Sequence, residues 1–311
     1  MSGFLVLSRL RFQHANALQA WWLLAPPSPM TVQGFVRALG RAVTGCPEGF
    51  PRSRIAIAHH SVQWLAATKR QWRYGKNREG GRDDKDWDVV FRGRRLIPQQ
   101  LQGATYIDKE DHIASGFAKS LQPTARCHGE ISVVIEVGNE PISLDAVKDF
   151  LWSARLGGGA IAAHGTVAVC ASFDEVIKTV GGGFWVVDRS DLVAQVMGRD
   201  GLDGTEALIR ILAAHSQEQQ AYAKTTLAER QQREKPESWL SANVVGYAAL
   251  EPLTKRIGVR GGLSHAYAEP LVGLVRYRSL HEDGQIPFWR YHTRPEKGVY
   301  LMTGQTAPIQ E

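Results

Sequence analysis

The stretch FLVLSRLRFQHANALQAWWLLAPPSPMTVQGFVRALGRAV, residues 4–43, decides the expected fold. Its first part, Phe4–Phe12, is apolar and then alternates between apolar and polar side chains, which is typical of a half-buried strand. Its last part predicts a helix, because Ser28 is a good N-cap and Pro29 suits the first helical position. Gly45 ends this helix. The chain therefore opens with a strand and a helix, joined by a connection rich in amide and indole side chains.

The same signals recur along the chain. Further strands are expected at RIAIAHHSV, EISVVIEV and AIAAHGTVAV, and a second helix begins at Ser143. The order strand, helix, strand, strand, helix, strand is that of a ferredoxin-like (RRM-type) β-α-β-β-α-β core of the α+β class. A basic insertion at about 64–129 separates the second strand from the third. A sheet of this kind offers one open face, which RNA-binding proteins of the same fold use.

Three parts are expected in the chain. Residues 1–190 form the RRM-like core with its insertion, residues 191–240 form a helical segment, and residues 241–311 form a C-terminal β-rich part packed on the core. The second half of the helical segment is polar. Such a helix either packs on a partner chain or is solvated.

Composition indicates a globular protein. The 311 residues are 43% hydrophobic and 22% charged, and no stretch approaches the roughly 18–20 apolar residues of a membrane helix. The apolar run Phe4–Leu7 is too short for a signal peptide, so we expect a cytoplasmic protein without membrane contact. Three widely spaced cysteines, Cys46, Cys127 and Cys170, fit reduced thiols better than disulfides.

Motifs of common enzymes and metal sites are missing from the sequence. It contains no phosphate loop, no paired CxxC, no HExxH and no dinucleotide fingerprint. His59 and His60 are adjacent in a predicted strand and would point to opposite faces, so they would not form one metal site. The glycine runs at 157–159 and 181–183 favour close backbone packing or close approach to a ligand. We therefore expect no enzymatic activity, no catalytic residues, no cofactor and no metal.

A basic run, KRQWRYGKNREGGR, lies in the insertion, and the chain as a whole has a formal charge of +6. Arginine forks match phosphate oxygens, and interleaved aromatic rings stack on unpaired bases. The alternative is a solvated loop. The residues predicted to contact phosphates of RNA or target DNA are Lys69, Arg70, Arg73, Lys76, Arg78 and Arg82.

A second set of candidates lies at the two ends of the chain. Amides of the N-terminal turn can read base edges or fix the turn, and indoles can stack on bases or pack in the core. C-terminal arginines near glycines can bind phosphates, although Arg276 and Arg278 could equally guard an exposed strand edge. The predicted RNA-binding residues are Gln13, His14, Asn16, Trp21, Arg256, Arg260, His265, Arg276 and Arg278.

The N-terminal stretch also carries a resemblance to a known family. It resembles the start of the subunit that caps the crRNA 5′ handle in type I-F CRISPR surveillance (Csy, Cascade-type) complexes, in the Cas-five group of RAMP proteins. That family opens with a QxANA turn, then PSP, then GFVHAL, and here Arg37 replaces the histidine. The similarity extends less densely from about Phe4 to Leu280. The matching residues are Gln13, Ala15, Asn16, Ala17, Pro27, Ser28, Pro29, Gly34, Phe35, Val36, Ala38 and Leu39.

The resemblance implies an RRM-like RAMP core and a non-catalytic scaffold that binds the crRNA 5′ handle. The implied partners are the CRISPR backbone subunit, a large subunit if the system has one, and target double-stranded DNA through the assembled complex. One alternative is a metal-independent endoribonuclease that processes crRNA, for which His14, His59 and His265 would be the candidates. Another is an RNA-binding protein outside CRISPR systems.

Overall fold

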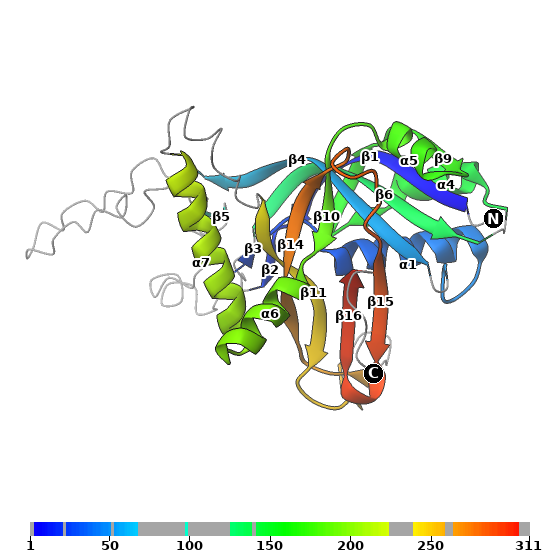
Figure 1. Ribbon diagram of the computed structural model, residues 1–311. Coiled ribbons are helices and arrows are strands. Elements are labelled where there is room, and N and C mark those ends of the chain that lie inside the picture. Colours follow the sequence, from blue (N-terminus) through cyan, green and yellow to red (C-terminus); the bar gives the residue numbers. More distant parts are fainter. Residues whose placement is uncertain are drawn as a thin grey trace, which may run out of the picture.

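The computed structural model shows a long, curved antiparallel sheet with helices packed against it (Figure 1). The residues that the structure describes are 3–20, 23–50, 53–67, 97–98, 125–138, 141–223, 239–258 and 264–304. The helices are α1 (Pro29–Thr44), α4 (Leu144–Ser153), α5 (Phe173–Val180), α6 (Ser190–Asp200), α7 (Gly204–Ala223) and the 3₁₀ turn η3 (Pro295–Lys297). In the part of the chain up to residue 170 the strands are β1 (Gly3–Asn16), β2 (Leu18–Ala20), β3 (Leu23–Leu24), β4 (Arg54–Ala67), β5 (Ile97–Pro98), β6 (Arg126–Val137), β7 (Arg155–Leu156), β8 (Gly159–Ala163) and β9 (Val167–Cys170). The later strands are β10 (Phe184–Asp188), β11 (Leu240–Ala249), β12 (Thr254–Lys255), β13 (Ser264–His265), β14 (Ala268–Ser279), β15 (Trp289–Arg294) and β16 (Val299–Gly304).

The main sheet runs in the order β10-β14-β11-β16-β15-β4-β6-β1-β8-β7, and β9 pairs with β1 beside β8. Strand β4 also pairs with β10, through His59 and Phe184. The six strands β4, β15, β16, β11, β14 and β10 therefore close a ring, and β4 belongs both to this ring and to the N-terminal sheet. Mixed helices and a large antiparallel sheet confirm the predicted α+β class.

The first helix begins and ends where the sequence predicts. The Oγ atom of Ser28 accepts a hydrogen bond from the Thr31 N–H at 3.2 Å, and Pro29 follows the cap. Gly45 takes a left-handed conformation with φ of 69° and ends the helix. Helix α4 has an equivalent cap, in which Ser143 Oγ accepts from the Ala146 N–H. Local capping chemistry thus fixes the two helices that lie between strands of the N-terminal sheet.

The predicted fourth strand is divided in two. Both β8 and β9 pair with β1, but a turn at residues 164–166 separates them. In that turn the Gly165 N–H donates to the Ser8 carbonyl at 2.8 Å, and the Ser8 N–H donates to the Thr166 carbonyl at 2.9 Å. The division coincides with an irregularity in β1 between Leu7 and Leu10.

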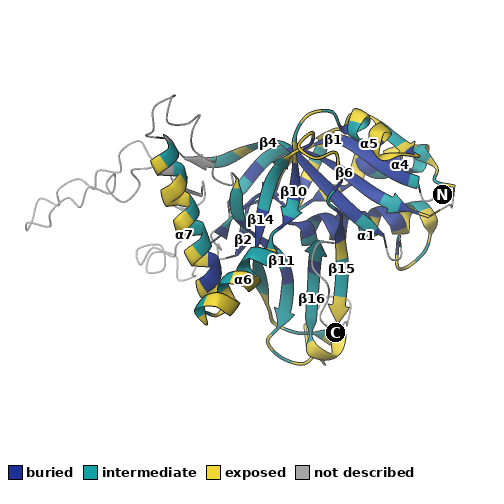
Figure 2. Ribbon diagram, viewed as in Figure 1, coloured by how far each residue is buried: buried dark blue, intermediate teal, exposed yellow. Residues whose placement is uncertain are grey.

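One face of the N-terminal sheet packs on α1 and α4, in a core that includes Leu5, Val36 and Val147. The opposite face was expected to be open, and it is open only in part. Phe4, Val6 and other apolar side chains on it are covered by α5, by Trp185 of β10 and by the segment Ile286–Phe288. The sequence of these strands explains the cover, because apolar side chains occupy both faces of β1, β4 and β6 near the buried centre of the sheet (Figure 2).

The described part of the predicted helical segment, up to residue 223, forms two helices, since Gly201 ends α6 with φ of 66°. Helix α7 buries Ala207 and Leu208 against β11 and β14, but most of its surface is exposed (Figure 2). Ile209, on this helix, is 59% exposed. No helix in the described part of the chain is long and apolar enough to span a membrane.

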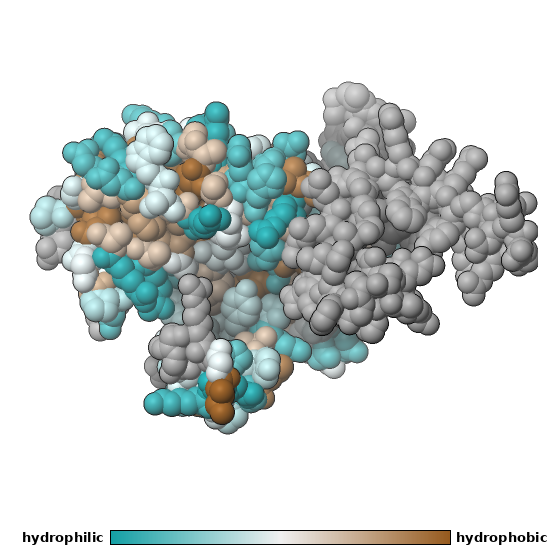
Figure 3. Space-filling model, turned by 180° about the vertical axis from the view of Figure 1, so that it is seen from behind, coloured by the Kyte–Doolittle hydropathy of each residue, from teal (hydrophilic) through white to brown (hydrophobic). Residues whose placement is uncertain are grey.

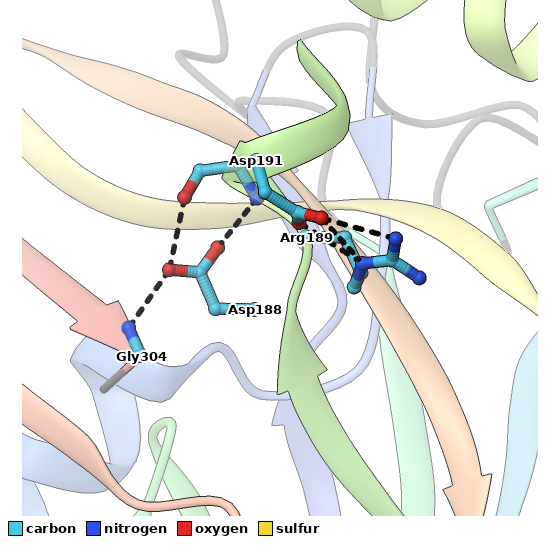
Figure 4. A network of polar contacts seen from close by, with 5 residues as sticks. Asp188, Arg189, Asp191 and Gly304 are labelled. Atoms are coloured by element: carbon cyan, nitrogen blue, oxygen red, sulfur yellow. Dashed lines mark hydrogen bonds and ion pairs between the residues drawn. The ribbon is translucent and has the colours of Figure 1, made fainter. Parts of the chain in front are cut away.

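Two polar contacts fasten the last strands to β10. The buried Asp188 carboxylate accepts from the Gly304 N–H at 2.8 Å and from both the N–H and the hydroxyl of Ser190, while Arg189 pairs with Asp191 (Figure 4). The indole N–H of Trp289 donates to the Val186 carbonyl at 2.7 Å. These contacts hold β15 and β16 to β10 across more than 100 residues of chain.

Candidate nucleic-acid interface

The part of the sheet face that α5 leaves uncovered is polar and mostly basic. It is formed by the C-terminal half of β1, the N-terminal half of β6 and the C-terminal half of β4. We call it the polar face. Its residues are Arg9, Arg11, Gln13, His14, His60, Ser61, Gln63, Arg126, His128 and Glu130.

Strand alternation and two β-bulges place the β1 side chains on this face. Leu10 and Phe12 are buried in the core, so Arg11 and Gln13 point the other way and are exposed. The register of β1 against β6 is irregular between Leu7 and Leu10 and again between Phe12 and Ala15. Each irregularity contains a non-glycine residue with positive φ, namely Arg9 at 50° and His14 at 58°. Such backbone is strained and often occurs at functional sites.

One carboxylate serves two arginines at the centre of the polar face. Arg9 Nη1 lies 2.7 Å from Glu130 Oε1, and Arg11 Nε lies 2.8 Å from Glu130 Oε2. The arginine side chains are 45% and 65% exposed, whereas that of Glu130 is only 13% exposed. Burial pushes the pKa of Glu130 upward, but the two guanidinium groups outweigh it and hold the pKa below its usual value. The cluster therefore keeps a net positive charge, with guanidinium N–H groups facing solvent.

Beside this cluster, two histidines and a third arginine surround the second bulge. The rings of His14 and His128 meet edge to face, with centroids 4.7 Å apart, and the His14 N–H donates to His128 Nδ1 at 3.2 Å. Arg126 Nη1 donates to the His14 carbonyl at 3.1 Å. Burial and the neighbouring His14 lower the pKa of His128. With Nδ1 accepting a hydrogen bond, neutral His128 carries its proton on Nε2.

Both glycine runs border the polar face. A Cβ atom on Gly159 would lie 2.5 Å from the Gln13 carbonyl oxygen, so this position requires glycine for the turn to pack on β1. Gly183, with φ of 145°, lies equally close to His60, where a Cβ would be 2.8 Å from Nδ1. The sequence-based interpretation of close backbone packing is correct for these two glycines. A Cβ atom on Gly158 would lie 3.8 Å from Arg126 Nη1, and one on Gly181 would lie 3.7 Å from Arg9 Nη2, so both turns adjoin arginines of the polar face.

Among the predicted residues at the N-terminus, the structure brings Gln13 and His14 onto the polar face and gives Asn16 another task. The Asn16 side chain accepts from the Leu18 N–H at 3.3 Å and donates to the Leu18 carbonyl at 3.1 Å. Its own carbonyl accepts from Gln19 Nε2. Of the two roles open to Asn16, fixing the turn is the one seen.

The predicted C-terminal residues lie elsewhere. Arg256 belongs to the hairpin of β12 and β13, where it pairs with Glu251 at 2.5 Å and stacks on the Tyr267 ring at 5.1 Å. His265 meets the same ring edge-on, with centroids 5.3 Å apart. This hairpin is separate from the polar face in the sheet topology.

Arg276 and Arg278 lie on one face of β14, as their spacing predicts, but each has an acidic partner. Arg276 lies 2.7 Å from Glu282, and Arg278 pairs with Asp283 and donates to the Gln285 carbonyl. Their side chains are 23% and 12% exposed. The pairs connect β14 to the turn that follows it.

Several predicted residues lie outside the described ranges. They are Trp21, Arg260 and the six basic residues of the insertion, Lys69, Arg70, Arg73, Lys76, Arg78 and Arg82. Their proposed contacts with RNA or DNA remain predictions from the sequence.

The histidines considered for catalysis differ in access. The His59 ring is buried, and burial together with the neighbouring His60 lowers its pKa to about 4. His60 points to the other face, where Nε2 lies 2.7 Å from Ser132 Oγ. Within the described ranges, no three His, Cys, Asp or Glu residues are grouped so that they could hold a metal ion.

Sequence reasoning missed Arg9, Arg11, Arg126 and His128. A signal was present, because Arg9, Arg11 and Gln13 alternate with Leu10 and Phe12 along a predicted strand. Arg126, His128 and Glu130 alternate in the same way on β6. The pairing of β1 with β6, which brings the two sets together, is not visible in the sequence.

The comparison with protein families identifies the chain. Residues 107–302, more than half of it, match the family model described as CRISPR-associated protein (Cas_Csy2). No curated protein sequence matches the chain. The family match corrects the resemblance drawn from the N-terminal motif, since the matched family is Cas_Csy2 and not the Cas-five group of handle-binding subunits, and the match begins after that motif. The chain therefore belongs to the Cas_Csy2 family, whose members are subunits of type I-F CRISPR complexes.

Proposed function

We propose that this Cas_Csy2 protein is a non-catalytic scaffold subunit that binds the 5′ handle of crRNA through the polar face. In this function the chain also contacts neighbouring subunits, including the repeated backbone subunit, and comes close to target DNA in the assembled complex. The observation that carries the proposal is the cluster of Arg9, Arg11 and Glu130, in which two exposed guanidinium groups share one shielded carboxylate. An RNA phosphate is the natural additional partner for such a pair.

The arrangement of the strands supports the proposal. Strands β8, β1, β6 and β4 lie side by side and antiparallel, while α1 and α4 cross on one side, as expected of a ferredoxin-like core. RRM-type proteins use the face opposite the helices for single-stranded RNA. Here the uncovered half of that face carries Gln13 and His14, whose side chains can read base edges, beside arginines that can hold phosphates.

A binding experiment with a matched control tests the proposal. The double variant Arg9→Ala/Arg11→Ala removes two arginines that share Glu130, and the control Arg199→Ala/Arg210→Ala removes two arginines that share Asp200 on α6 and α7. Fluorescence anisotropy with labelled crRNA should show a large loss of affinity for the first variant and almost none for the control. Equal affinity for both variants would contradict binding at the polar face.

The RNA probe decides whether the 5′ handle is the segment bound. Three RNAs of equal length are compared: the handle, a scrambled handle and a spacer sequence. The wild-type protein should favour the handle, and Gln13→Ala should reduce this preference more than it reduces the affinity for the scrambled RNA, because base contacts carry the specificity. Equal affinity for all three RNAs would leave a general RNA-binding scaffold and refute handle recognition.

One observation favours a second candidate function, metal-independent cleavage of crRNA. His14 and His128 form a close pair of imidazoles on the polar face, and general acid–base cleavage of RNA uses two such groups. Incubation of the protein with repeat RNA in EDTA distinguishes the two functions. A scaffold leaves the RNA intact, whereas specific products that disappear in His128→Ala would establish the nuclease.

A further inference from the structure

The sheet ends at an edge formed by β8 and β9. Both strands pair with β1 on one side. On the other side, β7 pairs only with Gly159 and Ala160, and the Ile161 N–H adds one long contact to Ala154 at 3.5 Å. No strand in the described part of the chain pairs with the outer edge of residues 161–163 or of β9. Backbone donors and acceptors are therefore exposed along this edge.

This edge has little of the usual protection. Natural sheets guard exposed edges with charged side chains, prolines or bulges that turn the strand away. The sequences of the two strands, GAIAA and VAVC, contain neither a charged residue nor proline, and one irregularity, at Ala162, interrupts the pairing of β8 with β1. An unguarded apolar edge in a soluble chain is a template for pairing with another strand.

Apolar side chains are exposed along both flanks of this edge. Trp152 of α4 is 86% exposed, Val169 is 49% exposed and Phe173 of α5 is 46% exposed. Figure 3 shows an apolar area at the end of the molecule where Figure 1 places α4, α5 and β9. A shallow groove of about 280 Å³ adjoins β8, and it is lined by Leu151, Trp152, Ile161, Ala162, Ala163 and His164.

We propose that the edge of β8 and β9 is a docking site for an extended, apolar segment of another protein subunit of the type I-F complex, which adds one strand to the sheet. The unpaired backbone identifies the occupant as a strand, because only another extended chain supplies alternating donors and acceptors at this spacing. The exposed Trp152, Val169 and Phe173 beside the edge favour apolar side chains on the added strand, with one of them seated in the groove beside Trp152. A segment of about six residues, the usual length of a strand, would cover it.

This inference rests on membership of the type I-F complex and is independent of RNA binding at the polar face. The added strand lies beyond β8 and β9, whereas the arginine cluster lies on the face formed by β1, β4 and β6. Failure of one proposal would therefore leave the other intact.

Hydrogen–deuterium exchange of the full chain tests the inference. The amides of residues 161–163 and 167–169 are measured in the chain alone, with crRNA alone, and after mixing with each purified protein subunit of the same complex. Slower exchange in these amides on addition of one protein subunit supports the proposal. No protection with any subunit, or protection with crRNA alone, would overturn it.

Substitutions complete the test. Trp152→Ala removes an exposed side chain, and Ala162→Lys/Val169→Lys adds two charges to the edge. The control Ala213→Lys/Ala214→Lys adds the same charge to exposed positions of α7. Both edge variants should lose at least tenfold in affinity for the protecting subunit while the control keeps it, and crRNA binding should not change. Because the lysines could unfold the strand, thermal melts accompany them, and Trp152→Ala serves as the variant that leaves the core intact.

Self-association is the competing occupant. Sedimentation of the chain alone over a range of concentrations detects it. A dimer whose formation protects residues 161–169 would assign the edge to a second copy and overturn the proposal, whereas a monomer with unprotected edge amides supports it.

Discussion

Two pairs of arginines, one on β1 and one on β14, have the same spacing and opposite surroundings. Arg9 and Arg11 share a single carboxylate and are largely exposed. Arg276 and Arg278 each have their own acidic partner and are largely shielded. The difference teaches that two arginines two residues apart on a strand do not define a phosphate site. The number of carboxylates within reach decides whether positive charge is left for a ligand.

The N-terminal sheet, which carries the β1 arginines, and the ring of strands that carries the β14 arginines share β4. The pH dependence of stability tests whether these two regions unfold as one unit. His59 is buried where β4 pairs with β10, and its pKa is about 4 in the folded protein against an ordinary value of 6.5. Its contribution to stability is complete above pH 6.5 and is lost as the pH falls from 6.5 to 4, in total about 3 kcal/mol. Thermal melts over this range should show a much smaller acid loss for His59→Asn than for the wild type.

The exposed His281 provides the control for that measurement. His281→Asn should keep the full acid loss. If the N-terminal sheet and the ring of strands unfolded independently, tryptophan fluorescence and a fluorescent probe on α4 would report separate acid transitions. The interpretation that they unfold as one unit would then be wrong.

The next largest expected effect concerns RNA affinity. Arg9→Ala/Arg11→Ala should weaken crRNA binding about 100-fold, since each charge-assisted hydrogen bond contributes roughly 1.5 kcal/mol or more. Arg276→Ala/Arg278→Ala should weaken it less than about threefold, because those guanidinium groups are already paired. Anisotropy titrations at one salt concentration compare the variants. A similar loss of crRNA affinity in both double variants would show that the two arginine pairs do not differ in RNA binding.

Stability should show the reverse order. Arg278→Ala removes the guanidinium group that pairs with Asp283 and donates to the Gln285 carbonyl, and should lower the free energy of unfolding by about 1–2 kcal/mol. Arg11→Ala removes a side chain that is 65% exposed and should change it by less than about 0.5 kcal/mol. Urea denaturation measures both. A larger loss for Arg11→Ala would mean that the β1 pair is structural.

The smallest expected effect is in the salt dependence of binding. Arg11→Ala should reduce the slope of log affinity against log salt by about 0.7, as expected for one lost contact with a single-stranded phosphate. Glu282→Gln/Asp283→Asn should raise affinity by about twofold to fivefold and steepen the slope, because it removes two negative charges beside the arginines of β14. An unchanged slope in both variants would show that neither pair meets RNA phosphates.

Local chemistry explains which parts of the fold could be predicted. Ser28, Pro29, Gly45 and Ser143 define the ends of α1 and the start of α4 through contacts within a few residues, and these were correct. Apolar periodicity likewise located β1, β4 and β6. The cover of the sheet by α5, Trp185 and Phe288 could not be predicted, because it depends on packing between segments that are far apart in the sequence.

Only a small part of the candidate site was predicted from the sequence. Gln13 and His14 were identified, but their neighbours Arg126, His128 and Glu130 come from a strand more than 100 residues later. Their proximity follows from the register of β1 and β6, and a shift of one residue would send these side chains to the other face. Arg278 was predicted to bind RNA although its acidic partner, Asp283, lies only five residues away in the sequence. The pairing depends on the geometry of the turn after β14, which the sequence does not reveal.

The direct pairing of β4 with β6 has a consequence for how members of this family can diverge. The two strands are fixed side by side although residues 68–125 separate them in the chain. The entropy cost of closing such a connection grows only with the logarithm of its length, so doubling it costs about 0.6 kcal/mol. Selection could therefore lengthen, shorten or replace this segment while the scaffold kept its stability. Divergence at this one junction can change what the subunit reaches without altering how it folds.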